Sequence, residues 1–114
     1  KAMDEQSEPV TIVDFDKLEL KVGEVLSCEP HPNADKLLVF RLRFGREERQ
    51  IVSGIRKYYQ PEQLIGKKLI AITNLKPVVL RGVESKGMLL SAATEDSLSL
   101  LSVLEDIDSG AEIS

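Results

Sequence analysis

The stretch LLVFRLRF, residues 37–44, alternates apolar and polar side chains with the two-residue period of a β-strand. One face of such a strand carries Leu38, Phe40, Leu42 and Phe44. The opposite face carries Val39, Arg41 and Arg43. Because a slip of one residue would exchange the two faces, the pattern predicts a strand with one face in a core and the other face partly basic.

Four further segments have strand patterns, and one short helix is expected among them. The strands are expected at 18–29, through Ile51 and Val52, at 67–75 and at 85–92, with 76–84 as a turn region. The first of them changes phase around Gly23, as a bulged strand does. Residues 60–66 fit a helix, because Pro61 suits a first helical position and Gly66 a terminating one. This order predicts an all-β fold, a five-stranded Greek-key barrel of the OB type with one short helix between strands three and four.

Extensions are expected at both ends of the barrel. Residues 1–10 have no periodicity, so a linker or disordered tail is expected there, with the folded domain at 11–114. A short helical turn with Asp14 as its cap is expected before the first strand. The apolar run 98–104 exceeds what five strands need, and an exposed apolar strand needs a partner. A dimer interface is therefore predicted at Ile12, Phe15, Leu18, Leu100, Leu101 and Val103.

The formal charge of the chain is unevenly distributed. The whole chain carries −4, yet residues 21–92 hold 13 Lys and Arg against 7 Asp and Glu. What attracts a polyanion is the local field over a surface, so the net charge is a poor guide here. The basic side of the barrel is expected to carry Arg41, Arg43, Arg56, Lys57, Lys76, Arg81 and Lys86. Scattered surface charge is the alternative interpretation.

Several classes of protein are excluded. No apolar run approaches the ~20 residues that span a bilayer, and the polar, acidic start is unlike a secretory signal, so a cytoplasmic location is expected. One histidine, His31, and one cysteine, Cys28, cannot make a zinc site of the usual ligand count, and no metal or cofactor is expected. No nucleophile with a base, phosphate loop or carboxylate pair is convincing, so the chain is not expected to be an enzyme.

The aromatic residues also limit the kind of ligand. Two tyrosines, three phenylalanines and no tryptophan make a poor stacking platform for single strands. Of the adjacent Tyr58 and Tyr59, one is expected in the core and one at the surface. A folded RNA that is recognised by its shape and backbone fits this composition better.

Four stretches resemble a known family: DFDKLELKVGEV, HPNADKLLVFRL, RQIVSGIRKYYQPEQLIGKKLIAITNLKP and LRGVESKGMLLSA. They are similar to the tRNA-binding domain at the C-terminus of many bacterial methionyl-tRNA synthetases and in free-standing bacterial tRNA-binding proteins. The likeness implies an OB fold that binds tRNA by shape, and a homodimer. By position it implies a binding hairpin with Asn74, Lys76 and Pro77 of NLKP and Ser85, Gly87 and Met88 of SKGM. Lys76, Arg81 and Lys86 are then expected to face the RNA backbone.

Two interpretations of function remain. The first is a dimerising tRNA-binding appendage of methionyl-tRNA synthetase, which raises the effective concentration of tRNA at a catalytic body elsewhere. The alternative is a free-standing tRNA-binding protein or a chaperone-like, dimeric protein-interaction module. Relatives often carry basic residues directly after NLKP, where this chain has Val78 and Val79, and this favours a weak auxiliary binder.

Overall fold

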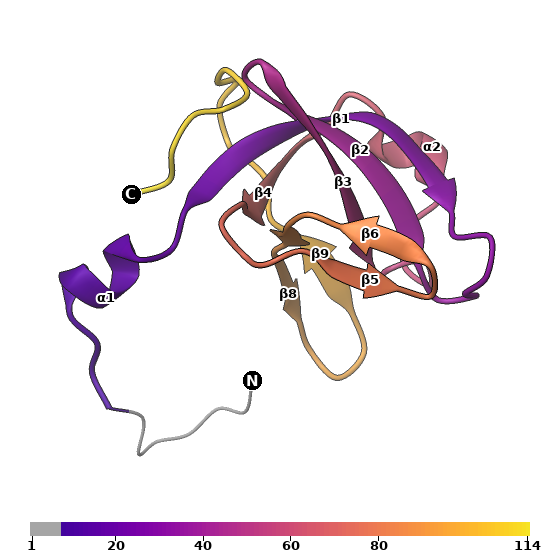
Figure 1. The fold of residues 1–114 in the computed structure, drawn as a ribbon, viewed down its shortest axis with the longest axis horizontal. Coiled ribbons are helices and arrows are strands. Elements are labelled where there is room, and N and C mark those ends of the chain that lie inside the picture. The colour runs from indigo at the N-terminus through magenta and orange to yellow at the C-terminus, as the bar shows by residue number, and fades with distance from the viewer. Residues whose placement is uncertain (1–7) are drawn as a thin grey trace.

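A curled antiparallel sheet of five strands forms the centre of the computed structural model, which describes residues 8–114 (Figure 1). Its strands are β1 (Leu20–Pro30), β2 (Leu38–Phe44), β3 (Glu47–Ser53), β4 (Lys68–Ile72) and β7 (Met88–Leu89). They lie in the order β3-β2-β1-β4-β7. The short helix α2 (Pro61–Leu64) stands between β3 and β4. The predicted all-β, five-stranded OB-type fold with a helix after the third strand is confirmed.

The alternation in β2 sets the core. Its four apolar side chains on one face are buried, and Phe40 at 0% exposed is the largest fully buried side chain. Strand β1 pairs with β4 through its first half and with β2 through its second half, so it must bend between them. The ring of Phe44 packs on this bend, 2.5 Å from where a Cβ of Gly23 would stand, so only glycine admits it. The register shift itself lies slightly later, between Val25 and Ser27.

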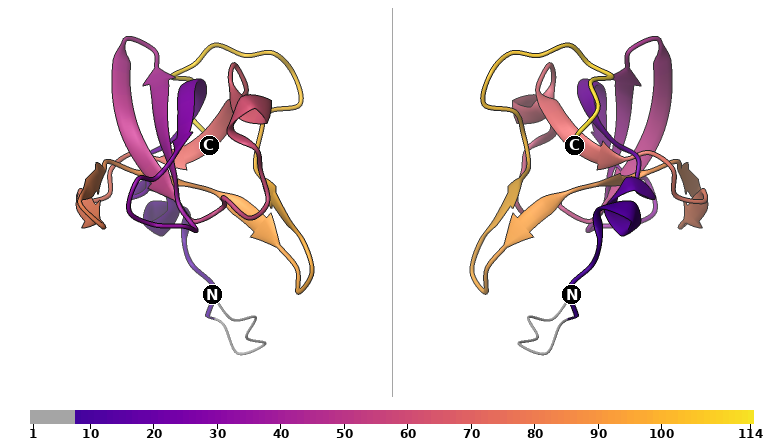
Figure 2. Two further views of the ribbon diagram at one scale, coloured as in Figure 1. Left: turned by 90° about the vertical axis from the view of Figure 1, so that its right-hand side faces the viewer. Right: turned by 90° about the vertical axis from the view of Figure 1, so that its left-hand side faces the viewer.

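Two further hairpins leave the barrel on opposite sides (Figure 2). One joins β5 (Val78–Leu80) to β6 (Val83–Ser85), and the other joins β8 (Ser91–Ala93) to β9 (Leu98–Leu100). The expected turn region at 76–84 is thus a paired hairpin. The expected single strand at 85–92 is divided, because Gly87 has φ +146° and because β7 pairs with β4 while β8 pairs with β9.

The run 98–104 is part of the barrel, so the expectation that it is surplus is wrong. Leu100 is a member of the core cluster. The amide of Ile70 donates to the carbonyl of Leu101, and Ser102 forms a bridge with Leu69 in β4. The barrel therefore needs this segment to cover strand β4.

Helix α1 (Ile12–Asp16) stands apart from the barrel and has no buried residue (Figure 1). Its N-cap is Thr11 rather than the expected Asp14. The Thr11 hydroxyl accepts from the Asp14 amide, and the Asp14 carboxylate accepts from the Thr11 amide, which together make a capping box. Most of the predicted linker, residues 1–7, lies outside the described residues. No helix in residues 8–114 is long and apolar enough to cross a membrane.

Candidate nucleic-acid interface

The β5–β6 hairpin is held against β3, which is an edge of the five-stranded sheet. The amide of Lys86 donates to Gln50 O at 2.8 Å, and the Gln50 side chain donates to Glu84 O at 2.8 Å. The Ser85 hydroxyl accepts from the amide of Val52 at 2.9 Å and is buried. Ser85, one of the predicted binding residues, therefore fixes the hairpin from the inside and does not reach the surface.

Arg49 joins the two ends of the hairpin. Its guanidinium donates from Nη1 to the carbonyl of Thr73, just before NLKP, and to that of Lys86 in SKGM, the latter at 3.1 Å. Its Nε lies 3.3 Å from Glu47 Oε1, an ion pair in which the N–H is not aligned for a hydrogen bond. One half-buried cation thus orders both segments that the family resemblance assigns to binding.

Sequence reasoning missed Arg49, because its two carbonyl partners lie 24 and 37 positions further along the chain. The two-residue period of a β-strand does indicate an inward position for this residue, because it puts Arg49 on the same face of β3 as the buried Ile51. Strand register agrees, since Arg49 lies opposite Leu42, whose side chain is in the core. An arginine on a core face usually has specific partners.

The tip of the hairpin rests on the loop between β1 and β2. His31 is buried, its Nε2 lies 2.9 Å from Leu80 O, and its Nδ1 accepts from the amide of Asn33 at 2.9 Å. Arg81 at the tip donates from Nε to Asn33 O at 3.3 Å. The hairpin is therefore fixed at both ends, at its base by Arg49 and at its tip by this loop.

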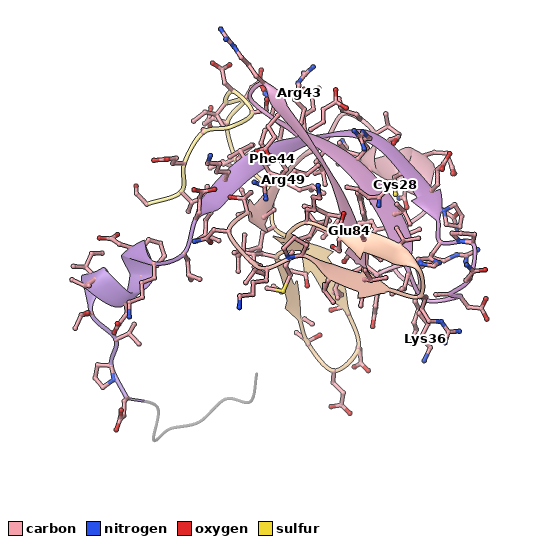
Figure 3. The ribbon with its side chains drawn as sticks, in the orientation of Figure 1. Cys28, Lys36, Arg43, Phe44, Arg49 and Glu84 are labelled. Atoms are coloured by element: carbon pink, nitrogen blue, oxygen red, sulfur yellow. The ribbon has the colours of Figure 1, made fainter. Side chains whose placement is uncertain are left out.

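Exposed cations surround this hairpin. Lys76 and Lys86 lie at its base and Arg81 at its tip. The tip meets the loop that carries Asn33 and Lys36, and this loop in turn meets the one that carries Arg56 and Lys57, since the Arg56 amide donates to Lys36 O at 3.3 Å. Lys36, which sequence reasoning did not single out, lies just beyond the hairpin tip (Figure 3).

Most of these cations have no ion-pair partner. Across residues 8–114, only Lys86 of this group lies within ion-pair distance of a carboxylate, 3.9 Å from Glu84 Oε1. The Lys57 ammonium lies 5.7 Å from the centre of the Tyr58 ring. This ring carries no negative charge, so Lys57 keeps its full positive charge. We call Lys36, Arg56, Lys57, Lys76, Arg81 and Lys86 the hairpin cations.

Arg41 and Arg43 are placed elsewhere, on the outer face of β2. Arg43 lies at the opposite end of the barrel from Lys36 (Figure 3). Arg41 pairs with Glu48 at 3.1 Å, and Arg43 pairs with Glu24. The structure thus brings five of the seven predicted basic residues together at the hairpin and leaves these two apart, already paired.

The remaining hairpin residues divide between support and surface. Asn74 accepts from the Glu19 amide and donates to Lys17 O, both at 2.8 Å, so it ties the hairpin base to the segment after α1. A Cβ on Gly87 would lie 2.9 Å from Ile72 O, so this position needs glycine. Pro77 and Met88 are exposed beside the cations and are free to contact a ligand.

The residues predicted for a dimer interface do not form one surface. Ile12, Phe15 and Leu18 line a depression of about 410 Å³ together with the C-terminal segment 112–114. Val103 instead lines a separate hollow with residues 66–68, Leu101 is exposed, and Leu100 is buried in the core. The apolar surface near α1 is therefore the part that remains open in this chain.

The cysteine, the two tyrosines and the possible metal ligands add no further site. Burial, with the nearby Glu62 and Glu29 carboxylates, raises the pKa of the Cys28 thiol to about 11, so it is neutral and shielded at pH 7. Tyr58 is exposed and Tyr59 packs on the core, as expected of the pair. Residues 8–114 contain no group of three or more His, Cys, Asp or Glu side chains that could hold a metal ion.

A curled five-stranded barrel with a cationic hairpin on one side has the architecture of the OB-type nucleic-acid-binding domains. The model of one family, described as a putative tRNA binding domain, matches residues 20–112. The chain belongs to this family.

The relatives include methionine–tRNA ligases. That of Caldanaerobacter subterraneus subsp. tengcongensis is 50% identical over 111 residues, which is 97% of this chain and 17% of the ligase. Methionine–tRNA ligase 1 of Bacillus anthracis is 52% identical over 113 residues, which is 99% of this chain and again 17% of the ligase. The chain thus spans a small part of these relatives.

Solved structures share the whole fold. A protein related to methionyl-tRNA synthetase from Pyrococcus horikoshii has a TM-score of 0.89 at 42% identity, over 95% of this chain and 100% of that one. The chaperone CsaA from Bacillus anthracis has a TM-score of 0.85 at 28% identity, over 94% of this chain and 100% of that one. The fold thus occurs both in a protein related to methionyl-tRNA synthetase and in a chaperone.

Proposed function

We propose that this chain binds tRNA with the hairpin cations and does so as a non-catalytic module of a methionine–tRNA ligase. The observation that carries the proposal is the gathering of unpaired cations around one fixed hairpin, in a chain whose net charge is −4. Lysine and arginine side chains that neutralise phosphates release counterions, and this supplies most of the affinity of a sequence-independent binder. The family assignment supports tRNA as the nucleic acid.

Recognition is by shape and backbone. The described surface offers a single exposed tyrosine ring, Tyr58, to stack on a base, because Tyr59 packs on the core and its hydroxyl accepts from the Leu100 amide at 3.0 Å. A fixed hairpin that presents cations at its base and its tip suits the regular phosphate spacing of a folded RNA. Different tRNAs should therefore bind with similar affinity.

Catalysis belongs to the rest of the ligase in this proposal. The folded module is residues 11–114, and its contribution is to raise the concentration of tRNA near a catalytic domain on the same chain. Such a role would place the protein in the cytoplasm.

A second copy of the chain is the partner that we propose for the apolar surface at α1. The exposed Ile12 and Leu18 and the half-buried Phe15 face the depression beside the C-terminal segment, and α1 buries none of its own residues. A dimer would cover them and would present two hairpins to RNA. The free-standing chaperone-like alternative uses the same surface for other proteins.

The test is tRNA binding by the whole chain, measured as fluorescence anisotropy of labelled tRNA between about 50 and about 200 mM salt. The logarithm of the affinity should fall linearly with the logarithm of the salt concentration, with a slope that reflects about three to six phosphates. Unstructured polyuridylate of equal length is the matched control and should bind less tightly. Absence of tRNA binding at the lowest salt would leave a dimerisation or chaperone module as the function.

Dimerisation is tested separately by sedimentation. Replacing Ile12 and Leu18 by glutamate should convert the dimer to monomers that still unfold cooperatively, since both side chains are exposed in the single chain. A wild-type chain that sediments as a monomer at micromolar concentration would contradict this part.

A further inference from the structure

Among residues 8–114, His31 is the only imidazole, and it is buried. It is 3% exposed, and both ring nitrogens are engaged, with Nδ1 accepting from the Asn33 amide and Nε2 facing Leu80 O. Because a carbonyl oxygen can only accept, the ring proton lies on Nε2, which donates to Leu80. The ring therefore bonds the loop after β1 to the last residue of β5, directly before the hairpin tip.

The tip itself is in an unfavourable conformation. Arg81 and Gly82 form the two-residue loop between the paired Leu80 and Val83, with φ +52° and φ +90°. This kind of turn favours asparagine or glycine at its first position, and an arginine there is strained. Strained residues persist where their surroundings hold them, and they are concentrated at functional sites.

The surroundings of Arg81 hold one end of its guanidinium and leave the other end free. Nε donates to Asn33 O at 3.3 Å, whereas the terminal amino groups have no hydrogen bond or ion pair within residues 8–114. The side chain is exposed, and Lys36 lies just beyond the tip (Figure 3). Two parallel N–H groups in a fixed plane match two oxygens of a phosphate, which a lysine cannot do.

We propose that His31 is a positioning residue for RNA binding: it holds the strained hairpin tip on the 31–33 loop, so that Arg81 presents its two terminal amino groups to one backbone phosphate. This inference rests on the proposed function. His31 touches no ligand itself and acts through Arg81.

The test compares three variants by tRNA affinity and by the dependence of that affinity on salt. His31→Phe keeps the volume of the ring and removes both hydrogen bonds. It should weaken tRNA binding about three- to tenfold and make the salt slope shallower by about one phosphate contact. Arg81→Ala should do the same, and the double variant should be no worse than either single variant, because both lose one contact.

Two controls separate positioning from general destabilisation. Tyr59→Phe removes another part-buried hydrogen bond, that from Leu100 in β9, which involves neither the β5–β6 hairpin nor the 31–33 loop. It should lower the melting temperature and leave affinity and salt slope unchanged. His31→Gln retains a donor that can reach Leu80 O, so it should restore much of the wild-type slope.

The possible outcomes are distinct. If Arg81→Ala leaves affinity and slope unchanged, the proposed hairpin contact with RNA fails, and this inference fails with it. If Arg81→Ala makes the slope shallower but His31→Phe does not, or if the double variant loses two contacts, the role of His31 is overturned while the proposed function stands.

A wild-type measurement decides the matter if His31→Phe does not melt cooperatively. In the nuclear magnetic resonance spectrum, the Arg81 Nε–H should give a resolved signal, protected from exchange by Asn33 O, which shifts when tRNA is added. An Arg81 signal that is averaged with solvent and insensitive to tRNA would refute the proposal.

Discussion

The hairpin β5–β6 and the hairpin β2–β3 are both surrounded by basic residues, yet they differ in how many of these charges are paired: on β2–β3 only Arg46, in the turn, has no ion pair within residues 8–114. On β2–β3, Arg41, Arg43 and Arg49 each lie within 3.3 Å of a glutamate oxygen. Around β5–β6 the closest pair in residues 8–114 is Lys86 with Glu84, at 3.9 Å. The number of cations in a segment therefore does not give the field that RNA meets, because cross-strand neighbours decide how much of it is compensated.

The largest effect is expected from removing the free charge. The triple variant Lys76→Ala, Arg81→Ala, Lys86→Ala should weaken tRNA binding about a hundredfold near physiological salt and make the salt slope shallower by about three. The double variant Arg41→Ala, Arg43→Ala should change affinity less than about threefold, because these charges are already paired. Anisotropy titrations measure both, and thermal melts confirm folding. An equal loss in the two variants would break the comparison.

A smaller effect is expected from disturbing the base of the hairpin. Gly87→Ala should destabilise the fold by about 2 kcal/mol, since the new Cβ would press on Ile72 O at 2.9 Å in addition to the strain of φ +146°. Gly66→Ala is the control, because Gly66 also has positive φ but meets nothing within 4 Å. It should cost about 1 kcal/mol. Urea unfolding separates the two, and equal losses would mean that the base is not tightly held.

A modest gain is expected from removing the acid on the free hairpin. Glu84→Gln should strengthen tRNA binding about two- to fourfold, because it releases Lys86 and removes a carboxylate that repels phosphate. Glu48→Gln, which releases Arg41 on the other hairpin, should have no measurable effect. A gain from Glu48→Gln as large as that from Glu84→Gln would show that RNA also lies across β2–β3.

The smallest effects are expected at Lys67 and Lys68, which are neighbours in sequence at the start of β4. Lys68 is held by Asp106 Oδ1 at 2.7 Å, and this contact lowers the pKa of the Asp106 carboxyl. Single alanine variants of Lys67 and Lys68 should each change tRNA affinity less than about twofold, against several-fold for Lys76→Ala. Filter binding at one salt concentration suffices. If the two prove more damaging than Lys76→Ala while melting normally, RNA lies across another face.

Much of the barrel could be predicted because its signals are local. The two-residue period of β2 and the Pro61 start of α2 each depend on a few neighbouring residues. The division of residues 85–92 into two strands could not be predicted from neighbouring residues. An apolar run looks continuous until its pairing partners are known, and here one part pairs with β4 and the next with β9.

The candidate site was predicted in part for the same reason. The basic residues of the hairpin are visible in the sequence. The sequence does not show that most of them lack an ion-pair partner. Arg49 and His31 were not assigned to the site, since their partners Lys86 and Leu80 lie 37 and 49 positions further along the chain. The burial of Leu100 also depends on distant strands.

The amino-acid sequence by itself determined the strand periodicity, the glycines that permit the bend and the tight loops, and the excess of cations in the central part of the chain. These properties follow from each residue and its near neighbours. Only the tertiary structure decided which cations are paired, which serine and arginine support the hairpin, and where its tip rests. Such choices depend on hydrogen bonds and ion pairs between segments that meet only when the barrel closes.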